Sequence, residues 1–249
     1  MILVQTVEYH YLWNSYQDSC SQIKEIFSTV NLILFDFDKT IINKDTGAEY
    51  MKFMVQRNPI RFVLCFFALP FTLPFLILNK TKFIGFSVLL WLVTCGMSPK
   101  KIVTLRKHFI NRYLENKATV IYKNAIEQLI SHAQNKDRVV IVSGASEWMV
   151  KRIIVKLCIP MLEFACSEET RLAGGMVSKF HCYSTKKVER IKMRYNLEEY
   201  ETIIGYSDSS IDIPLLRLCN QQIIVNPKPN CGTKLTKSFG KSMKIVKWV

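Results

Sequence analysis

Two carboxylates that could do chemistry, Asp36 and Asp38, stand two residues apart directly after the apolar run Leu32–Phe35. The run predicts a short buried strand, whose carboxyl end would bring both carboxylates to the sheet edge where open α/β proteins bind ligands. A carboxylate needs no activation to act as a nucleophile at neutral pH, and a second one can carry a proton or help hold a cation. The same pair is also typical of a solvated strand end, so alone it does not predict a site.

Three later segments each bring polar groups to the end of a predicted strand or the start of a predicted helix. The predicted elements are strands over 138–143 and 202–206 and a helix that begins near residue 187. The groups are, in chain order, Ser143 with Gly144, Lys187, and Asp208 with Asp212. A lone Ser is often a helix N-cap and a lone Lys often a solvated helix face. Only their combination with the aspartate pair indicates a site.

These four segments, in this order, resemble the motifs of the haloacid dehalogenase superfamily of phosphatases: Asp-x-Asp-x-Thr, Ser/Thr, Lys and an Asp-rich turn. The resemblance implies an α/β fold, with a Rossmann-like catalytic core and a mostly parallel sheet over 31–43 and 136–249. Nearly 100 residues separate the first two strands, far more than a direct crossover needs, so 44–135 should form an inserted helical cap. Residues 1–30 then form an N-terminal extension.

The resemblance also implies roles for the acids. Asp36 would attack phosphorus and form an aspartyl-phosphate, and Asp38 would protonate the leaving alkoxide and then deprotonate the water that cleaves the intermediate. A cation must offset the repulsion between these acids and a phosphate, and Mg²⁺ prefers hard oxygen ligands. Its implied ligands are Asp36, the main-chain carbonyl of Asp38, and Asp208, with Asp212 supporting the metal site.

The remaining motifs would hold the phosphoryl group. Ser143 and the backbone at Gly144 would donate to its oxygens, and Lys187 would neutralise charge during transfer. Lys186 is adjacent and the Gly that usually precedes the motif lysine is absent, so the sequence leaves open which of the two belongs to the site. The four histidines show no spacing for a catalytic or metal group, and each is expected to be an ordinary polar residue: His10, His108, His132 and His181.

Two apolar segments, Phe62–Leu78 and Phe83–Met97, dominate the predicted cap. Each is shorter than the roughly 20 residues of a membrane crossing, and Pro70 and Pro74 should break the first. We favour a membrane-embedded, re-entrant hairpin over two full spans, and place two buried helices of a soluble cap third, because a small cap has little interior. Cations stand in the turn and at both outer ends: Lys80 and Lys82, then Arg57, Arg61, Lys100 and Lys101.

Composition is compatible with a membrane-associated enzyme. The 249 residues carry 34 Lys+Arg against 20 Asp+Glu, a net charge of +14 that suits nucleic acid, anionic lipid or a phosphorylated ligand. No strand face interleaves basic and aromatic residues, so nucleic acid is not expected. The 8 cysteines are scattered, which favours reduced thiols, and the first 30 residues predict no signal peptide.

Further segments resemble one family within the superfamily, the bacterial phosphatidylglycerophosphatase C family. They are Asp36–Thr40, Ser87–Trp91 with Thr94–Gly96, and Gly205–Ser209 continuing through Asp212–Leu216. The resemblance implies an inner-membrane enzyme, with its core on the cytoplasmic side, that converts phosphatidylglycerophosphate to phosphatidylglycerol with no protein partner. Lys39 stands where that family often has Gly.

Two other functions remain open. A soluble phosphoserine phosphatase-like enzyme shares the core motifs and usually has a Glu nine positions after the nucleophile, where this chain has Asp45. A catalytically inactive, basic membrane-binding protein would also explain the charge and the apolar cap, but the intact acids argue against it.

Overall fold

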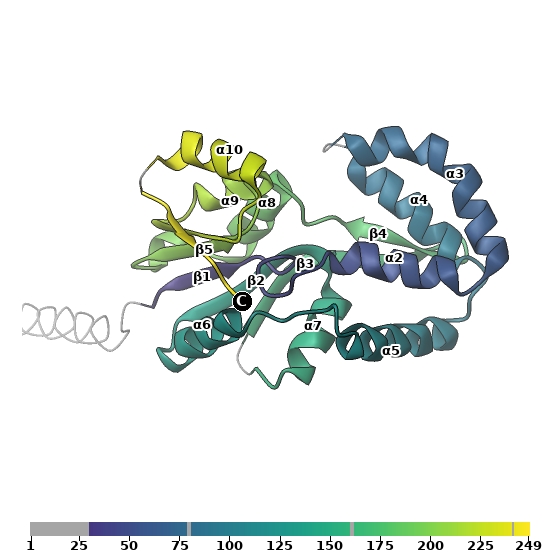
Figure 1. Ribbon diagram of the computed structural model, residues 1–249, viewed down its shortest axis with the longest axis horizontal. Helices are drawn as coiled ribbons and strands as arrows, with labels where there is room; N and C mark the ends of the chain where they lie inside the picture. The colour runs from purple at the N-terminus through teal and green to yellow at the C-terminus, as the bar shows by residue number, and fades with distance from the viewer. Residues whose placement is uncertain (1–29, 79–80, 160–161, 241) are drawn as a thin grey trace, which may run out of the picture.

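A computed structural model describes residues 30–78, 81–159, 162–240 and 242–249, whose strands form one seven-stranded sheet (Figure 1). The sheet order is β4-β3-β2-β1-β5-β6-β7, and neighbours are parallel except for the antiparallel pair β3 and β4. The strands are β1 (Leu32–Phe35), β2 (Arg138–Ser146), β3 (Leu162–Leu172), β4 (Gly175–Phe180), β5 (Ile203–Ser207), β6 (Gln221–Val225) and β7 (Lys244–Val246). The predicted N-terminal extension lies outside the described residues, apart from Val30.

The central strand β1 is buried on both faces because its side chains alternate between two hydrophobic clusters. Ile33 and Phe35 join one cluster, and Leu32 and Leu34 join the other. Helices α6 (Lys123–Gln134) and α7 (Glu147–Lys156) contribute to the first cluster, and α8 (Thr185–Arg194) and α9 (Ile213–Leu216) to the second. Helix α10 (Pro229–Phe239) packs on α9 through Leu235 and Leu216. The predicted α/β fold with a mostly parallel sheet is confirmed.

The sequence predicts a short strand over 162–166, a hairpin over 169–181 with Gly174-Gly175 at its centre, and a helix over 210–219. In the structure, the short strand and the first arm of the hairpin form one long strand, β3. The predicted helix is a 3-10 turn, Ser210–Asp212, followed by the short α9. The chain turns back early because Asn220 exchanges two hydrogen bonds with the backbone of Ile203 and leads directly into β6.

The inserted cap contains α2 (Thr46–Gln56), α3 (Pro59–Ile77), α4 (Lys82–Thr94) and α5 (Pro99–Glu115). The prediction that Pro70 and Pro74 break the first apolar segment is wrong, since α3 runs through both. Prolines four residues apart lie on the same face of a helix, so their missing N–H groups bend it rather than end it; Figure 1 shows the curve. Helix α6 lies within 44–135 but packs on β2, so by its contacts it belongs with the sheet.

Helix α4 covers β4, the strand at one edge of the sheet. Two hydroxyls of the helix accept hydrogen bonds from backbone N–H groups of the strand. Thr94 Oγ1 accepts from Met176 at 2.8 Å, and Ser87 Oγ accepts from Ser178 at 3.1 Å. A Cβ on Gly175 would lie 2.6 Å from the Trp91 ring, so only Gly fits beneath that indole. These contacts fix the apolar hairpin α3–α4 to the sheet and satisfy two N–H groups of an edge strand that would otherwise be open.

Candidate active site

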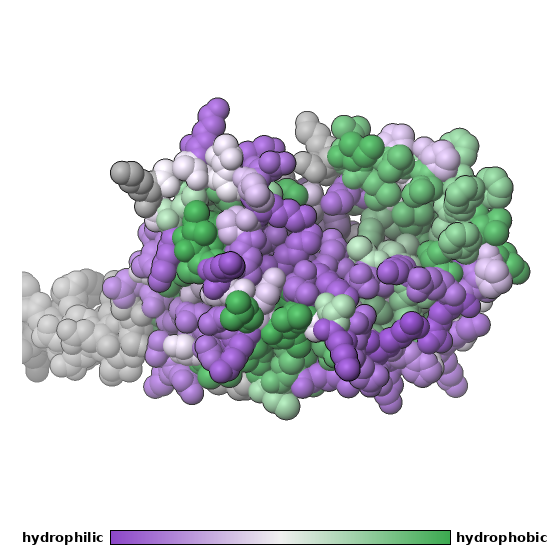
Figure 2. Space-filling model, in the orientation of Figure 1, coloured by the Kyte–Doolittle hydropathy of each residue, from purple (hydrophilic) through white to green (hydrophobic). Residues whose placement is uncertain are grey.

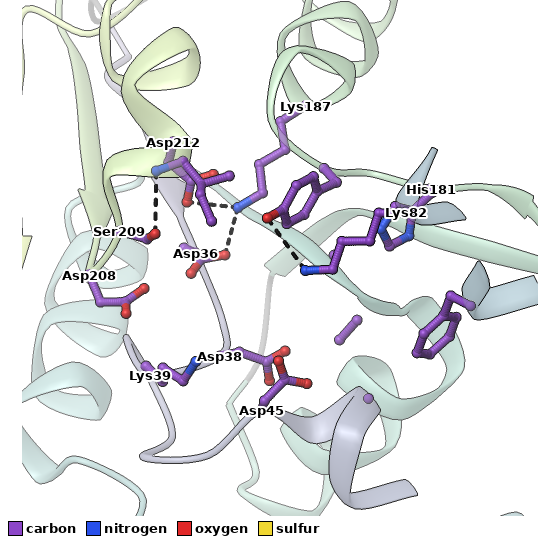
Figure 3. Close-up of a pocket in the computed structure, with 16 residues that line it drawn as sticks. Asp36, Asp38, Lys39, Asp45, Lys82, His181, Lys187, Asp208, Ser209 and Asp212 are labelled. Carbon is purple, nitrogen blue, oxygen red and sulfur yellow. Dashed lines mark hydrogen bonds and ion pairs between the residues drawn. The ribbon is translucent and has the colours of Figure 1, made fainter. Parts of the chain in front are cut away.

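The carboxyl ends of β1, β2 and β5 meet at one cavity of about 200 Å³ (Figure 3). The predicted acids Asp36, Asp38, Asp208 and Asp212 all line this cavity, together with Gly144 and Lys187. The parallel strands explain this meeting, because parallel neighbours end at the same edge of the sheet.

Lys187 lies at the centre of a buried ion cluster. Its Nζ donates to Asp36 Oδ1 at 2.7 Å and to Asp212 Oδ2 at 2.8 Å, and Asp212 Oδ2 also accepts from Ser207 Oγ at 2.8 Å. Burial alone would lower the pKa of Lys187, but the two carboxylates raise it well above its usual range, so the ammonium stays charged. Lys186 points outward and pairs with Glu189. The lysine of this site is therefore Lys187.

Asp38 is held by the first residue of α2, which the sequence prediction missed. Its Oδ1 accepts from the Thr46 backbone N–H at 2.9 Å and from Thr46 Oγ1 at 2.5 Å. Burial raises the pKa of Asp38 to about 7, and the nearby Asp45 adds to the rise, while the Thr46 hydrogen bonds oppose it. The carboxyl can therefore give or take a proton near neutral pH. An N-cap at Asp45 followed by Thr was the available signal.

Ser143 is buried at the end of the core part of β2, and its Oγ accepts from the Ala145 N–H at 3.0 Å. Gly144 and Ala145 form the cavity wall at this point. The predicted contact between Ser143 and a phosphoryl group stays a prediction.

Lys39 adopts a left-handed backbone conformation, with φ of 62°. Gly reaches this region at no steric cost, which accounts for the Gly that often stands here in the family resembled. The chain turns sharply after Asp38, and this turn requires the left-handed conformation. Lys39 also lines the cavity.

Four further residues, which the sequence analysis did not place in the site, line the cavity. Lys82 and Phe86 come from the first turns of α4, and His181 and Tyr183 come from the segment after β4. The rings of His181 and Tyr183 stack with centroids 5.5 Å apart, and Lys82 Nζ lies 4.5 Å from the Tyr183 ring centroid. Contacts between residues some 100 positions apart leave no local signal in one sequence.

Residues 33–217 match the haloacid dehalogenase-like hydrolase family. The chain belongs to this family. Solved structures with a similar fold include a protein of unknown function from Bordetella pertussis Tohama I, with TM-score 0.69 and 17% identity over 88% of this chain and 99% of that one. They also include a substrate-bound phosphoserine phosphatase, with TM-score 0.51 and 17% identity over 83% and 91%, respectively. A phosphoserine phosphohydrolase-like protein from Francisella tularensis has TM-score 0.56 and 14% identity over 87% and 95%.

The cavity of this haloacid dehalogenase-like hydrolase is rich in negative charge. Five aspartates line it against three lysines: Asp36, Asp38, Asp45, Asp208 and Asp212, against Lys39, Lys82 and Lys187. Burial raises the pKa of Asp208 to about 6, and the Asp212 charge adds to the shift. Burial also raises the pKa of Asp36, and the Lys187 ammonium opposes this rise. Burial is the largest cause of both shifts, and neighbouring acids add to them.

The aspartate oxygens of the cavity fit Mg²⁺, the cation that haloacid dehalogenase-like phosphatases typically use. In the described part of the chain, no three His, Cys, Asp or Glu side chains group closely enough to coordinate an ion by themselves. Mg²⁺, however, usually takes one or two carboxylates and completes its sphere with water and substrate phosphate. Asp36 Oδ2 has only a 3.5 Å contact with Thr40 Oγ1, and Asp208 projects into the same cavity, so two hard anionic donors are available (Figure 3).

Proposed function

We propose that this hydrolase removes the phosphate from a phosphomonoester through a covalent intermediate on Asp36. The observation that carries the proposal is the carboxylate of Asp36 at the end of the central strand, 2.7 Å from the Lys187 ammonium and two residues before Asp38, which lines the same cavity. A phospho-aspartyl intermediate analogue has been solved for a phosphoserine phosphatase of similar fold, with TM-score 0.50 and 19% identity.

In the first step, an Asp36 oxygen attacks phosphorus, the bond from phosphorus to the substrate oxygen breaks, and the leaving alkoxide takes the Asp38 proton. In the second step, Asp38 takes a proton from water as that water attacks the aspartyl-phosphate, which releases inorganic phosphate and restores Asp36. Lys187 favours the ionised form of Asp36 and orients it, and Thr46 orients Asp38. Mg²⁺, held by Asp36, the Asp38 carbonyl and Asp208, would neutralise phosphate charge.

We propose further that the substrate is a lipid phosphate, because the cap exposes an apolar surface beside the cavity. Helix α3 has the length and composition of a membrane-crossing helix. Its most apolar 18 residues have mean hydropathy 2.1, yet only 11% of them are buried. Phe66, Phe67 and Phe71 are 64–77% exposed, and Figure 2 shows the apolar surface over α3 and α4. An exposed apolar patch of this kind on a basic protein suits an anionic membrane.

The arrangement of α3 and α4 supports a hairpin that lies in the membrane interface. Arg61, near the start of α3, donates to the carbonyls of Leu92 and Cys95 at the end of α4, at 3.0 and 2.8 Å. At the opposite end of the hairpin, Lys82 lines the catalytic cavity. Thr94, the last residue of α4, accepts a hydrogen bond from the backbone of β4. Because both ends of the hairpin contact the sheet or its cavity, the hairpin cannot carry one end across a bilayer in this conformation. At about 1.5 Å per residue, the 13 residues of α4 are also too short to cross.

Phosphatidylglycerophosphate is the substrate we propose, from the sequence resemblance and this surface; the site would then face the cytoplasmic side of a bacterial inner membrane. The alternative is a soluble phosphomonoester such as phosphoserine, which the structural neighbours favour by fold alone. Asp45, at the position where those enzymes usually have Glu, accepts from the Ala48 N–H as the N-cap of α2.

Phosphate release from matched substrates in detergent with Mg²⁺ tests both proposals. The panel is phosphatidylglycerophosphate, phosphatidic acid, phosphoserine and a small aryl phosphate, each with and without EDTA. We expect the phospholipids to be hydrolysed fastest and EDTA to abolish all release. Preference for phosphoserine would overturn the lipid proposal and keep the phosphatase, and no release from any substrate would overturn both.

A further inference from the structure

Lys82 is the cation that the cap brings into the catalytic cavity. It opens α4, directly after the turn of the apolar hairpin, and its side chain extends toward the space above the acids (Figure 3). Its Nζ donates to Tyr183 Oη at 3.4 Å and lies 4.5 Å from the centroid of the same ring.

The two other lysines of the cavity have their charges compensated by acids. Lys187 bridges Asp36 and Asp212. The charge of Lys39 acts on Asp38 and Asp208, whose pKa values it lowers, although Lys39 forms no salt bridge among the described residues. Lys82 has no carboxylate within 4.0 Å in the part of the chain that the structure describes. Its interactions are with a neutral phenol and an aromatic face, so its charge is available to an anion that enters the cavity.

The side chains packed around Lys82 are aromatic rings, and Asp45 lines the same cavity. Phe86 and His181 stack at 6.2 Å between centroids, and His181 and Tyr183 stack at 5.5 Å. Burial, the largest cause, and the Lys82 charge lower the pKa of His181 to about 4, so that ring is neutral at pH 7. His181 Nε2 is buried and has no hydrogen-bond partner among the described residues, which leaves a second polar atom for a ligand.

We propose that Lys82, with His181 and Tyr183, forms a subsite that binds a second anionic group of the substrate while its phosphomonoester lies at Asp36. One cation without a carboxylate partner, packed against aromatic groups, suits a singly charged anion, and the phosphodiester of a glycerophospholipid headgroup is such a group. The inference rests on the proposed phosphatase activity and makes Lys82 a specificity-determining residue. A phosphomonoester without a second anion gains nothing from this subsite.

The test compares two lipids that differ in that group. The ratio of kcat/KM for phosphatidylglycerophosphate, which has the phosphodiester, to kcat/KM for phosphatidic acid, which lacks it, is measured in mixed micelles. Lys82→Gln should lower this ratio by about 10- to 100-fold, the usual value of a hydrogen bond to a charged group, with the change mainly in KM. Lys82→Arg should restore most of it. Lys186→Gln, which removes an exposed lysine outside the cavity, is the matched control and should leave the ratio unchanged.

Each outcome separates the inference from the proposed function. An unchanged ratio in Lys82→Gln, with wild-type activity on both lipids, overturns the subsite and leaves the lipid phosphatase. A wild-type preference for phosphoserine that Lys82→Gln abolishes supports the subsite and assigns the second anion to a soluble carboxylate. A wild-type protein that hydrolyses no phosphomonoester overturns both.

Discussion

At the scale of single residues, the site keeps several carboxylates close together with fewer cations than acids. Lys187 offsets Asp36 and Asp212 through bonds of 2.7 and 2.8 Å. Burial, and after it the charge of a neighbouring aspartate, raises the pKa values of Asp38 and Asp208. Such shifts are typical of functional sites. Substrate phosphate adds further negative charge, so activity should depend strictly on a divalent cation.

Asp36→Asn tests the nucleophile. The amide nearly preserves shape but cannot attack phosphorus, so phosphate release should fall by several orders of magnitude while the far-ultraviolet circular dichroism stays that of the wild type. Asp38→Asn should lose about 10²–10⁴-fold, the usual contribution of proton transfer. Wild-type release by the Asp36→Asn protein would exclude the covalent mechanism.

Thr46→Val tests a positioning residue. The substitution removes the 2.5 Å hydrogen bond to Asp38 and keeps the side chain's volume, so kcat should fall about 10- to 100-fold. The proton on Asp38 should also be lost at a higher pH, because a bond that favours the carboxylate is gone. Thr46→Ser retains the hydroxyl and is the control; equal losses in both variants would point to packing instead.

His181 makes stability depend on pH in a direction that can be measured. Its pKa in the folded protein is about 4, below its usual 6.5. As pH falls from 6.5 to 4, His181 is therefore protonated in the unfolded chain but stays largely neutral in the folded protein. The wild type should lose stability relative to His181→Gln over this window, at most about 1.4 kcal/mol per pH unit, with no such divergence above pH 7. The same difference in unfolding temperature between the two proteins at pH 4.5 and at pH 7.5 would contradict this.

At the scale of elements, the strands and their terminal acids were predictable because a short apolar run followed by a carboxylate is a local pattern. The choice of Lys187 over Lys186 was not, since neighbouring residues of a helix differ only in the direction they face. The continuity of α3 through Pro70 and Pro74 was also missed, because the sequence shows two helix breakers and not their common face. Lys82 lies in the site because α4 packs on β4. That contact joins distant parts of the chain, so no local pattern predicts it.

Gly175→Ala tests that packing. The new Cβ would lie 2.6 Å from Trp91, so either the indole or the strand must move, and the free energy of unfolding should fall by about 1–3 kcal/mol. Cleavage by a protease within α3 and α4 should become faster. Gly232→Ala is the matched control, since a Cβ there meets nothing within 4 Å and Ala favours the helix.

At the scale of the whole molecule, one end is a charged catalytic body and the other an apolar hairpin, as Figure 2 shows. The wild type should therefore sediment with membranes and resist extraction by high salt or carbonate, because salt screens charge but does not weaken apolar burial. Phe67→Asp with Phe71→Asp, which charge two side chains 67% and 77% exposed, should release the protein.

Val155→Asp controls for a new charge on an exposed apolar residue, since Val155 is 73% exposed on α7, away from the hairpin. This variant should remain with the membrane. A wild-type protein that stays in solution without detergent would favour a soluble phosphomonoester over a lipid phosphate as the substrate.

The position of β1 at the centre of the sheet also sets the order of events during synthesis. β1 pairs with β2 on one side and with β5 on the other, where Leu34 stands opposite Gly205. The ribosome must therefore complete β5 before Asp36 and Asp208 can share a cavity, on the order of 10 s after it has released α3, at about 5–20 residues per second. If the hairpin binds a bilayer as we propose, it can do so during this interval, before the catalytic groups first meet.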